Sequence, residues 1–343
     1  MTIDRRTLLK GAAGGLALAA GPRLAAAQGS EDWSAVEAAG KKEGSLQVYS
    51  AYNGDAVPAI VKAFEARYGI RTDLLVPARP NELRERVRVE QSSGRFSGDV
   101  MFTSASQAKI IYAADKTIAP VPHVPNAARI RPGLETDAQI VSVMVNPSGF
   151  MINTALVPPA EEPKSWADLL DPKWKGRIMM DEPRNVGAGY LLFYVLYEKL
   201  GRSFVERLAA QKPIISTEPR EARRRVARGE AAILAPLLLP DIAGLKGLPV
   251  KAVVPAEGCT YNQYGNTLLV RAPHPNAARL YMNFALSDEG QMLFARDGFG
   301  VAVQSVIDRL PPDVREIANA KLLGTIDPAR QDEMLARARE IFG

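Results

Sequence analysis

The feature that most constrains the fold of this chain is a repeated order of strand, loop and helix. An apolar run over residues 45–50 predicts a strand, and residues 57–68 carry apolar side chains at the i, i+3, i+4 and i+7 spacing of a helix. A strand over 70–76, a helix over 82–91 and a strand over 100–102 continue the order. Because parallel strands connect through right-handed crossovers, this order predicts a largely parallel sheet. Ligands of such sheets bind at the carboxyl ends of the strands.

Two longer β-rich stretches, residues 140–154 and 261–270, interrupt this order, and a second α/β set lies between them. The break at Asn146-Pro147-Ser148-Gly149 suits a strand that passes from one lobe to another. We therefore predict an α/β fold with two lobes, in which two mixed sheets with flanking helices are joined by two crossover strands. We expect residues 28–147 plus about 260–310 to form the first lobe, and residues 148–259 plus about 311–343 to form the second.

The first 27 residues have the features of an export signal. Arg5 and Arg6 are adjacent and precede an apolar run over residues 11–21, which is too short to cross a bilayer and is followed by Ala25-Ala26-Ala27. Paired arginines in this position resemble a twin-arginine signal. We therefore expect a periplasmic protein from which residues 1–27 are removed.

Charge, cysteine content and motifs exclude several classes of protein. The leader carries four basic residues and one acidic residue, so it accounts for +3 of the formal net charge of +5. The remaining charge gives no reason to expect a nucleic-acid partner. Cys259 is the only cysteine, so no internal disulfide can form. No nucleophile–base, P-loop or zinc motif is present, and His123 and His274 lie far apart, so we predict neither an enzyme nor a cofactor.

Five segments, in order along the chain, resemble the ferric-iron-binding branch of the periplasmic solute-binding proteins that serve ABC transporters. They lie at residues 44–70, 97–104, 165–178, 221–236 and 265–294, and include SGDVMFTS and SWADLLDPKWKGRI. The resemblance implies the type 2 periplasmic binding protein fold, which closes two lobes on a ligand. It also implies an ABC permease in the inner membrane as the partner.

The iron ligands of that branch have no counterpart in this chain. The resemblance places Asn53 where the histidine ligand would be, Ser104 where the glutamate would be, and Leu237-Leu238 where two adjacent tyrosines would be. Ferric ion requires hard anionic ligands, which leucine cannot supply. We therefore predict no metal site.

The residues expected to bind ligand lie at one helix start and at several strand ends. Arg184 precedes small residues whose free backbone N–H groups can bind an anion, and an unpaired Arg184 would add a bidentate contact. The candidates are Tyr52, Asn53, Arg79, Ser104, Ser106, Arg184, Asn185, Gly187, Ala188, Gly189, Tyr261 and Tyr264. Plainer roles remain open: helix capping for the two serines, surface turns for Tyr52 and Asn53, and a solvated loop for Arg79.

These patterns predict a monomeric, periplasmic, substrate-binding component of an ABC importer. Its expected ligand is a small organic anion, such as a phosphonate, a phosphorylated compound or a carboxylate. Two alternatives stay open. One is binding of ferric iron or an iron–anion complex through Tyr261 or Tyr264, and the other is a periplasmic enzyme.

Overall fold

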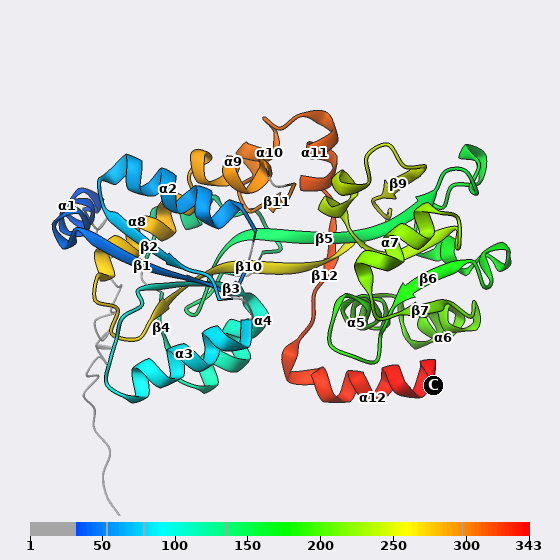
Figure 1. The fold of residues 1–343 in the computed structure, drawn as a ribbon, viewed down its shortest axis with the longest axis horizontal. Coiled ribbons are helices and arrows are strands. Elements are labelled where there is room, and N and C mark those ends of the chain that lie inside the picture. Colours follow the sequence, from blue (N-terminus) through cyan, green and yellow to red (C-terminus); the bar gives the residue numbers. More distant parts are fainter. Residues whose placement is uncertain (1–31, 53, 78–79, 122, 135, 297) are drawn as a thin grey trace, which may run out of the picture. The chain divides into compact units, whose positions relative to one another are not determined.

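The computed structural model describes residues 32–343 except 53, 78–79, 122, 135 and 297, so the leader with its expected twin-arginine signal lies outside the described residues. Within the described part, twelve strands form one sheet. Its main path runs β2-β1-β3-β10-β5-β8-β6-β7, and β4, β9, β11 and β12 pair beside that path (Figure 1). No described helix has both the length and the apolar character needed to span a membrane.

The first lobe contains the strand and helix order that the sequence predicts. β1 (Ser45–Ser50) pairs in parallel with β2 (Arg71–Leu75) and with β3 (Val100–Ser104). The connecting helices α2 (Ala56–Tyr68) and α3 (Pro80–Ser92) lie on opposite faces of these strands (Figure 1). All three strands therefore end at one edge of the sheet, where their loops can meet a ligand.

The two long strands that join the lobes are β5 (Val141–Asn153) and β10 (Cys259–Leu269), as the sequence predicts. They pair with each other in antiparallel fashion. β10 also pairs with β3 of the first lobe, and β5 also pairs with β8 of the second. Because each crossover strand is hydrogen-bonded along both edges, the strands of the two lobes form one continuous path rather than two separate sheets.

The second lobe is built on three parallel strands, β6 (Ile178–Asp181), β7 (Ile214–Ser216) and β8 (Ile233–Leu238). Its helices are α5 (Ala188–Leu200), α6 (Arg202–Ala210) and α7 (Pro219–Ala227). β6 leads directly into α5, so the helix start lies at the carboxyl end of a strand.

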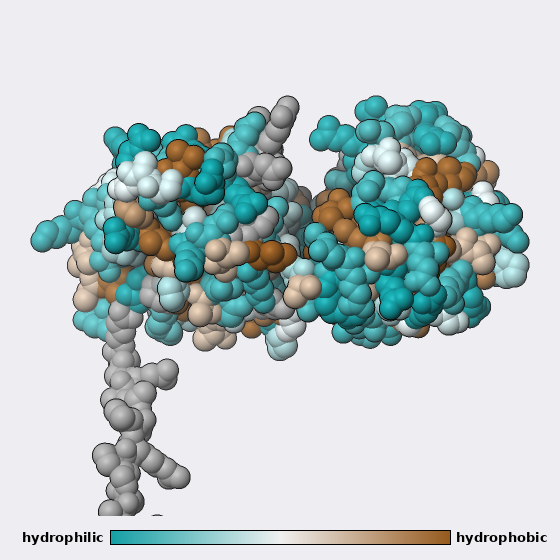
Figure 2. All heavy atoms as spheres, turned by 90° about the horizontal axis from the view of Figure 1, so that it is seen from below, coloured by the Kyte–Doolittle hydropathy of each residue, from teal (hydrophilic) through white to brown (hydrophobic). Residues whose placement is uncertain are grey.

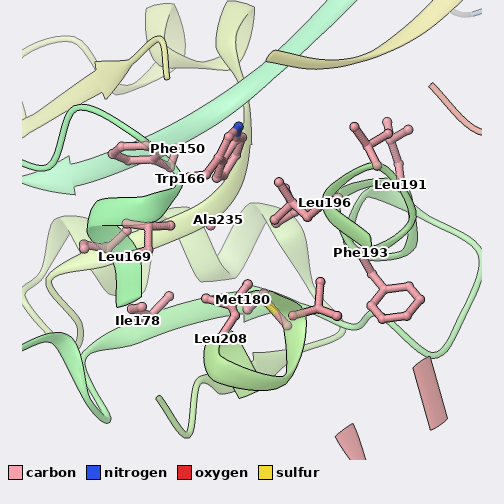
Figure 3. Close-up of a cluster of buried hydrophobic side chains, with 14 of the residues drawn as sticks. Phe150, Trp166, Leu169, Ile178, Met180, Leu191, Phe193, Leu196, Leu208 and Ala235 are labelled. Atoms are coloured by element: carbon pink, nitrogen blue, oxygen red, sulfur yellow. The ribbon is translucent and has the colours of Figure 1, made fainter. Parts of the chain in front are cut away.

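An apolar cluster holds α5 against this sheet. Figure 3 shows Leu196 of α5 and Met180 of β6 in the same cluster as Trp166, and all three are buried. The Trp166 indole N–H donates to the Gly258 carbonyl oxygen at 2.9 Å, which satisfies the polar atom of this side chain. Burying each large apolar side chain stabilises the fold by about 1.5–3 kcal/mol. The position of the α5 start is therefore fixed by packing.

The remaining elements complete both lobes. The helices are α1 (Trp33–Glu43), α4 (Ala105–Gln107), α8 (Pro275–Ala285), α9 (Asp288–Arg296), α10 (Gln304–Ile307), α11 (Pro312–Ala318) and α12 (Gln331–Phe342), with a π-helix, η1 (Ala108–Tyr112), after α4. The 3-10 helices are η2 (Pro125–Arg129), η3 (Pro159–Glu161), η4 (Ala167–Leu170), η5 (Pro172–Trp174), η6 (Leu239–Leu245) and η7 (Pro328–Arg330). The short strands are β4 (Ile118–Ala119), β9 (Val250–Val253), β11 (Gly300–Val301) and β12 (Leu322–Gly324).

Candidate functional site

Two of the expected ligand residues lie where β3 passes into α4. The Ser104 hydroxyl caps α4 by accepting the Gln107 backbone N–H at 3.3 Å. The Ser104 and Ser106 hydroxyl oxygens lie 3.2 Å apart. Neither side chain is fully buried. Capping does not use the whole hydrogen-bonding capacity of a hydroxyl group, so both serines can still meet a ligand.

The tyrosine candidates pack among other aromatic side chains. The ring centroids of Tyr52 and Tyr264 are 5.6 Å apart, and the Tyr52 ring lies 5.5 Å from that of Phe299. The Tyr261 hydroxyl donates to the Gly133 carbonyl oxygen at 3.1 Å. Burial raises the pKa of Tyr264, which keeps this phenol protonated. The remaining first-lobe candidates, Asn53 and Arg79, lie outside the described residues.

Arg184 is not the unpaired arginine that the sequence suggested, and that expectation was wrong. Its guanidinium forms two hydrogen bonds of 2.7 Å with the Glu182 carboxylate and also donates to the Gly343 carbonyl oxygen. The Arg184 backbone N–H binds the same carboxylate at 2.9 Å. Hydrogen bonding from Arg184 lowers the pKa of Glu182. Because Glu182 and the last residue of the chain already use this guanidinium, it is not free for a bidentate contact with a ligand.

The start of α5 nevertheless opens into a pocket of about 260 Å³. The backbone N–H of Leu191 is the first to bond within the helix, to the Gly187 carbonyl oxygen at 3.0 Å. The amides of the preceding turn have no acceptor within the helix and carry the positive end of its dipole. The lining residues are Asp181, Glu182, Asn185, Val186, Gly187, Ala188, Ser216, Thr217 and Pro219.

Gly189 allows the helix start to lie against the end of β6. A Cβ atom at this position would lie 2.4 Å from the Asp181 carbonyl oxygen, which is closer than packed atoms approach. Gly187, by contrast, has open space around it. The sequence analysis singled out both glycines, and the structure gives them different roles: one permits close packing and the other leaves the pocket open.

Asp181, which the sequence analysis missed, lines the same pocket. Its residue surface is only 7% exposed, and among the described residues burial and the charge of Arg223, without a hydrogen-bond donor, act on its carboxylate. Burial raises its pKa to about 6 in spite of the nearby Arg223 guanidinium. Arg223 itself donates to the Asp241 carboxylate. A charged residue at the end of the apolar run Ile178–Asp181 was the available signal.

A second pocket, of about 450 Å³, lies between the lobes. The first lobe contributes Ser106 and Lys109, the second contributes Tyr194 and Lys199 of α5, and the crossover strand β10 contributes Gln263. Figure 2 views the molecule from the side on which α3 and α12 lie in Figure 1. It shows the surface hollowed between the two lobes. This interlobe pocket and the pocket at the start of α5 involve opposite ends of the same helix.

Residues 91–323 match the family described as bacterial extracellular solute-binding protein. The chain belongs to this family. An uncharacterized protein of Haemophilus influenzae is 30% identical to this solute-binding protein over 277 residues, which cover 77% of this chain and 79% of that protein.

Solved structures show the same two-lobed α/β fold of periplasmic binding proteins. IdiA (FutA) of Trichodesmium, in complex with iron and citrate, is 18% identical with a TM-score of 0.73 over 87% of this chain and 99% of that one. Iron-bound HitA of Pseudomonas aeruginosa is 21% identical with a TM-score of 0.65, over 87% and 99%. AfuA of Actinobacillus pleuropneumoniae, bound to fructose-6-phosphate, is 20% identical with a TM-score of 0.60, over 87% and 98%.

The described part of this solute-binding protein contains no cluster of three His, Cys, Asp or Glu side chains that could hold a metal ion. Leu237 and Leu238 end β8, and Leu237 is buried. His274 binds Asp99 at 3.0 Å and Ser45 at 2.8 Å, which ties its ring to β1 and to the residue before β3. The polar side chains that line the pocket at the start of α5 are instead two hydroxyls, an amide and the carboxylates of Asp181 and Glu182.

Proposed function

We propose that this solute-binding protein is the periplasmic receptor of an ABC importer and that it binds a small organic anion. Family membership supports a role in binding and delivering a solute, since the family comprises solute-binding proteins rather than enzymes. The proposal includes export by the twin-arginine route, removal of residues 1–27, action as a monomer and an inner-membrane permease as the partner.

The observation that carries the proposal is the pocket at the start of α5. Helix-start amides bind anions because their N–H groups point outward and the helix dipole favours negative charge. Here they open into a pocket that also holds the hydroxyls of Ser216 and Thr217 and the amide of Asn185. The anion therefore docks on the amides around Ala188, and Arg184 holds the loop in place through Glu182 without touching the ligand.

The rest of the binding energy comes from the first lobe. We place the two lobes in residues 28–147 plus about 260–310 and in residues 148–259 plus about 311–343, with hinges in β5 and β10. We propose that Ser104 and Ser106 contact the ligand from the first lobe on closure, which requires the interlobe pocket that Ser106 lines to join the pocket at the start of α5. A ligand that contacts both lobes favours the closed form because it binds that form more tightly than the open one.

Ferric iron is the second candidate, since IdiA and HitA are structures with bound iron. The described tyrosines offer little support for it. Tyr261 donates to a backbone carbonyl group, and the pKa of Tyr264 is raised, which opposes the phenolate that iron would need. A charge-transfer band in the visible range on addition of ferric citrate would favour this candidate over a metal-free organic anion.

The test is titration calorimetry of the mature protein with phosphonates, phosphorylated compounds and carboxylates, repeated with Ala188→Asp. Ala188 is exposed, and an acidic residue in the first turn of a helix is favourable for stability, so this variant should fold. Its charge should repel an anion and weaken binding at least tenfold. Ser203→Asp, an exposed position in the first turn of α6, is the matched control. Equal affinity in the wild type and Ala188→Asp would refute the proposed site.

A further inference from the structure

The pocket at the start of α5 contains a group that an anion alone does not explain. Asp181 ends β6, is more than nine-tenths buried and lines the same pocket as Gly187 and Ala188. A carboxylate at this position works against the binding of an anion at neighbouring amides, because like charges repel. The presence of both features in one pocket indicates a ligand with two different ends.

The groups around Asp181 do not satisfy its charge. The positive charge that acts on Asp181 is that of Arg223 in α7. The Arg223 guanidinium, however, donates its hydrogen bond to Asp241 of η6. The charge of Arg220 also acts on Asp241. Glu182, the next residue, is neutralised by Arg184. Despite Arg223, the pKa of Asp181 remains raised to about 6, so the guanidinium does not offset burial.

A buried carboxylate without hydrogen-bond donors destabilises a fold, so we expect a ligand to supply the partner that the protein does not. The open side of Asp181 is the pocket. A hydroxyl group of the ligand would supply one donor but no charge. An ammonium group supplies up to three hydrogen-bond donors and a full positive charge, so it provides both the donors and the opposite charge that Asp181 lacks.

We propose that the ligand carries a protonated amine that binds Asp181 while its anionic group docks on the amides at the start of α5. This inference rests on the proposed function and narrows the substrate class to small amino-bearing anions. Because Asp181 and Ala188 line one pocket of about 260 Å³, the two charged groups of the ligand are separated by a short carbon chain. Amino carboxylates and amino phosphonates of two to four carbons have this form.

The test compares each amino-bearing anion with its deaminated analogue by titration calorimetry. The probes are γ-aminobutyrate against butyrate and 2-aminoethylphosphonate against ethylphosphonate. In the wild type, the amino member of at least one pair should bind at least tenfold more tightly. Asp181→Asn should abolish this difference by weakening binding of the amino member, while the deaminated member binds as tightly as in the wild type or more tightly, because a repelling charge is removed. The matched control is Asp308→Asn, which replaces an exposed carboxylate at the end of α10. It should change neither affinity.

A preference for the amino member that survives in Asp181→Asn overturns the inference. Equal or tighter binding of the deaminated members by the wild type overturns the inference. So does an equal loss of both members in Asp181→Asn, which would assign Asp181 a structural role, with thermal melting as the check on folding. If neither pair binds, but another anion binds the wild type and binds Ala188→Asp more weakly, the inference fails and the proposed function stands. If no anion binds at all, the proposed function fails as well.

Discussion

Replacing Asp181 by asparagine should stabilise the unliganded protein, and the gain should depend on pH. Burial raises the pKa of Asp181 from 3.8 to about 6. Each pKa unit corresponds to about 1.4 kcal/mol, so the ionised form costs about 3 kcal/mol of folding free energy above pH 6. The folded state binds the extra proton between the two pKa values, so wild-type stability falls as the pH rises through that window. Asparagine has nearly the same shape and does not ionise.

The gain from Asp181→Asn should therefore be small below pH 4, grow between pH 4 and pH 6, and level off at about 3 kcal/mol above pH 6. Such a gain corresponds to a rise in melting temperature of roughly 6–12 °C. Urea unfolding from pH 4 to pH 8, followed by tryptophan fluorescence, suits the measurement because Trp166 and Trp174 are buried in the same lobe as Asp181. Asp308→Asn is the control. A gain that does not vary with pH, or a loss of stability at pH 8, would refute the reasoning.

Three further substitutions test the roles assigned to the site. Gly189→Ala should cost about 1–3 kcal/mol of unfolding free energy in urea, because its Cβ would lie 2.4 Å from the Asp181 carbonyl oxygen. Gly187→Ala has open space and should stay within about 0.5 kcal/mol, so equal losses would contradict the packing argument. Arg184→Ala should leave anion affinity within about threefold in titration calorimetry, since Glu182 already holds this guanidinium; a tenfold loss would restore a direct contact. Ser106→Ala should weaken anion binding about three- to tenfold, as expected for one lost hydrogen bond, and no change would remove this serine from the site.

Most of the fold could be predicted because its strands and helices follow local patterns. The strand expected over residues 70–76 is Arg71–Leu75, and the long strand expected over 261–270 is Cys259–Leu269. α7 begins at Pro219 after Glu218, without a side-chain cap. Proline is favoured at the first position of a helix because it lacks the N–H group that would be unbonded there. That boundary could therefore have been predicted from the sequence as well.

The side chains of the site were harder to predict because pairing of charges is a tertiary property. The sequence placed the start of α5 correctly, since small residues after a strand suffice for that inference. It could not show that Glu182 binds Arg184, because two charged side chains separated by one residue in a loop can point either way. It also gave no sign that Arg223, on another helix, would be held by Asp241 and leave Asp181 without a donor.

The same buried carboxylate affects both the stability of the empty protein and the choice of ligand. A carboxylate that costs the empty protein about 3 kcal/mol should become favourable once an ammonium group reaches it, because the ligand then supplies the charge and the donors that the fold does not. A purely structural Asp181 would instead have donors from the protein, and its replacement would weaken the fold. Asp181→Asn therefore separates the two roles: higher stability together with loss of amine selectivity is expected only of a binding residue, because a structural residue would lose stability on replacement.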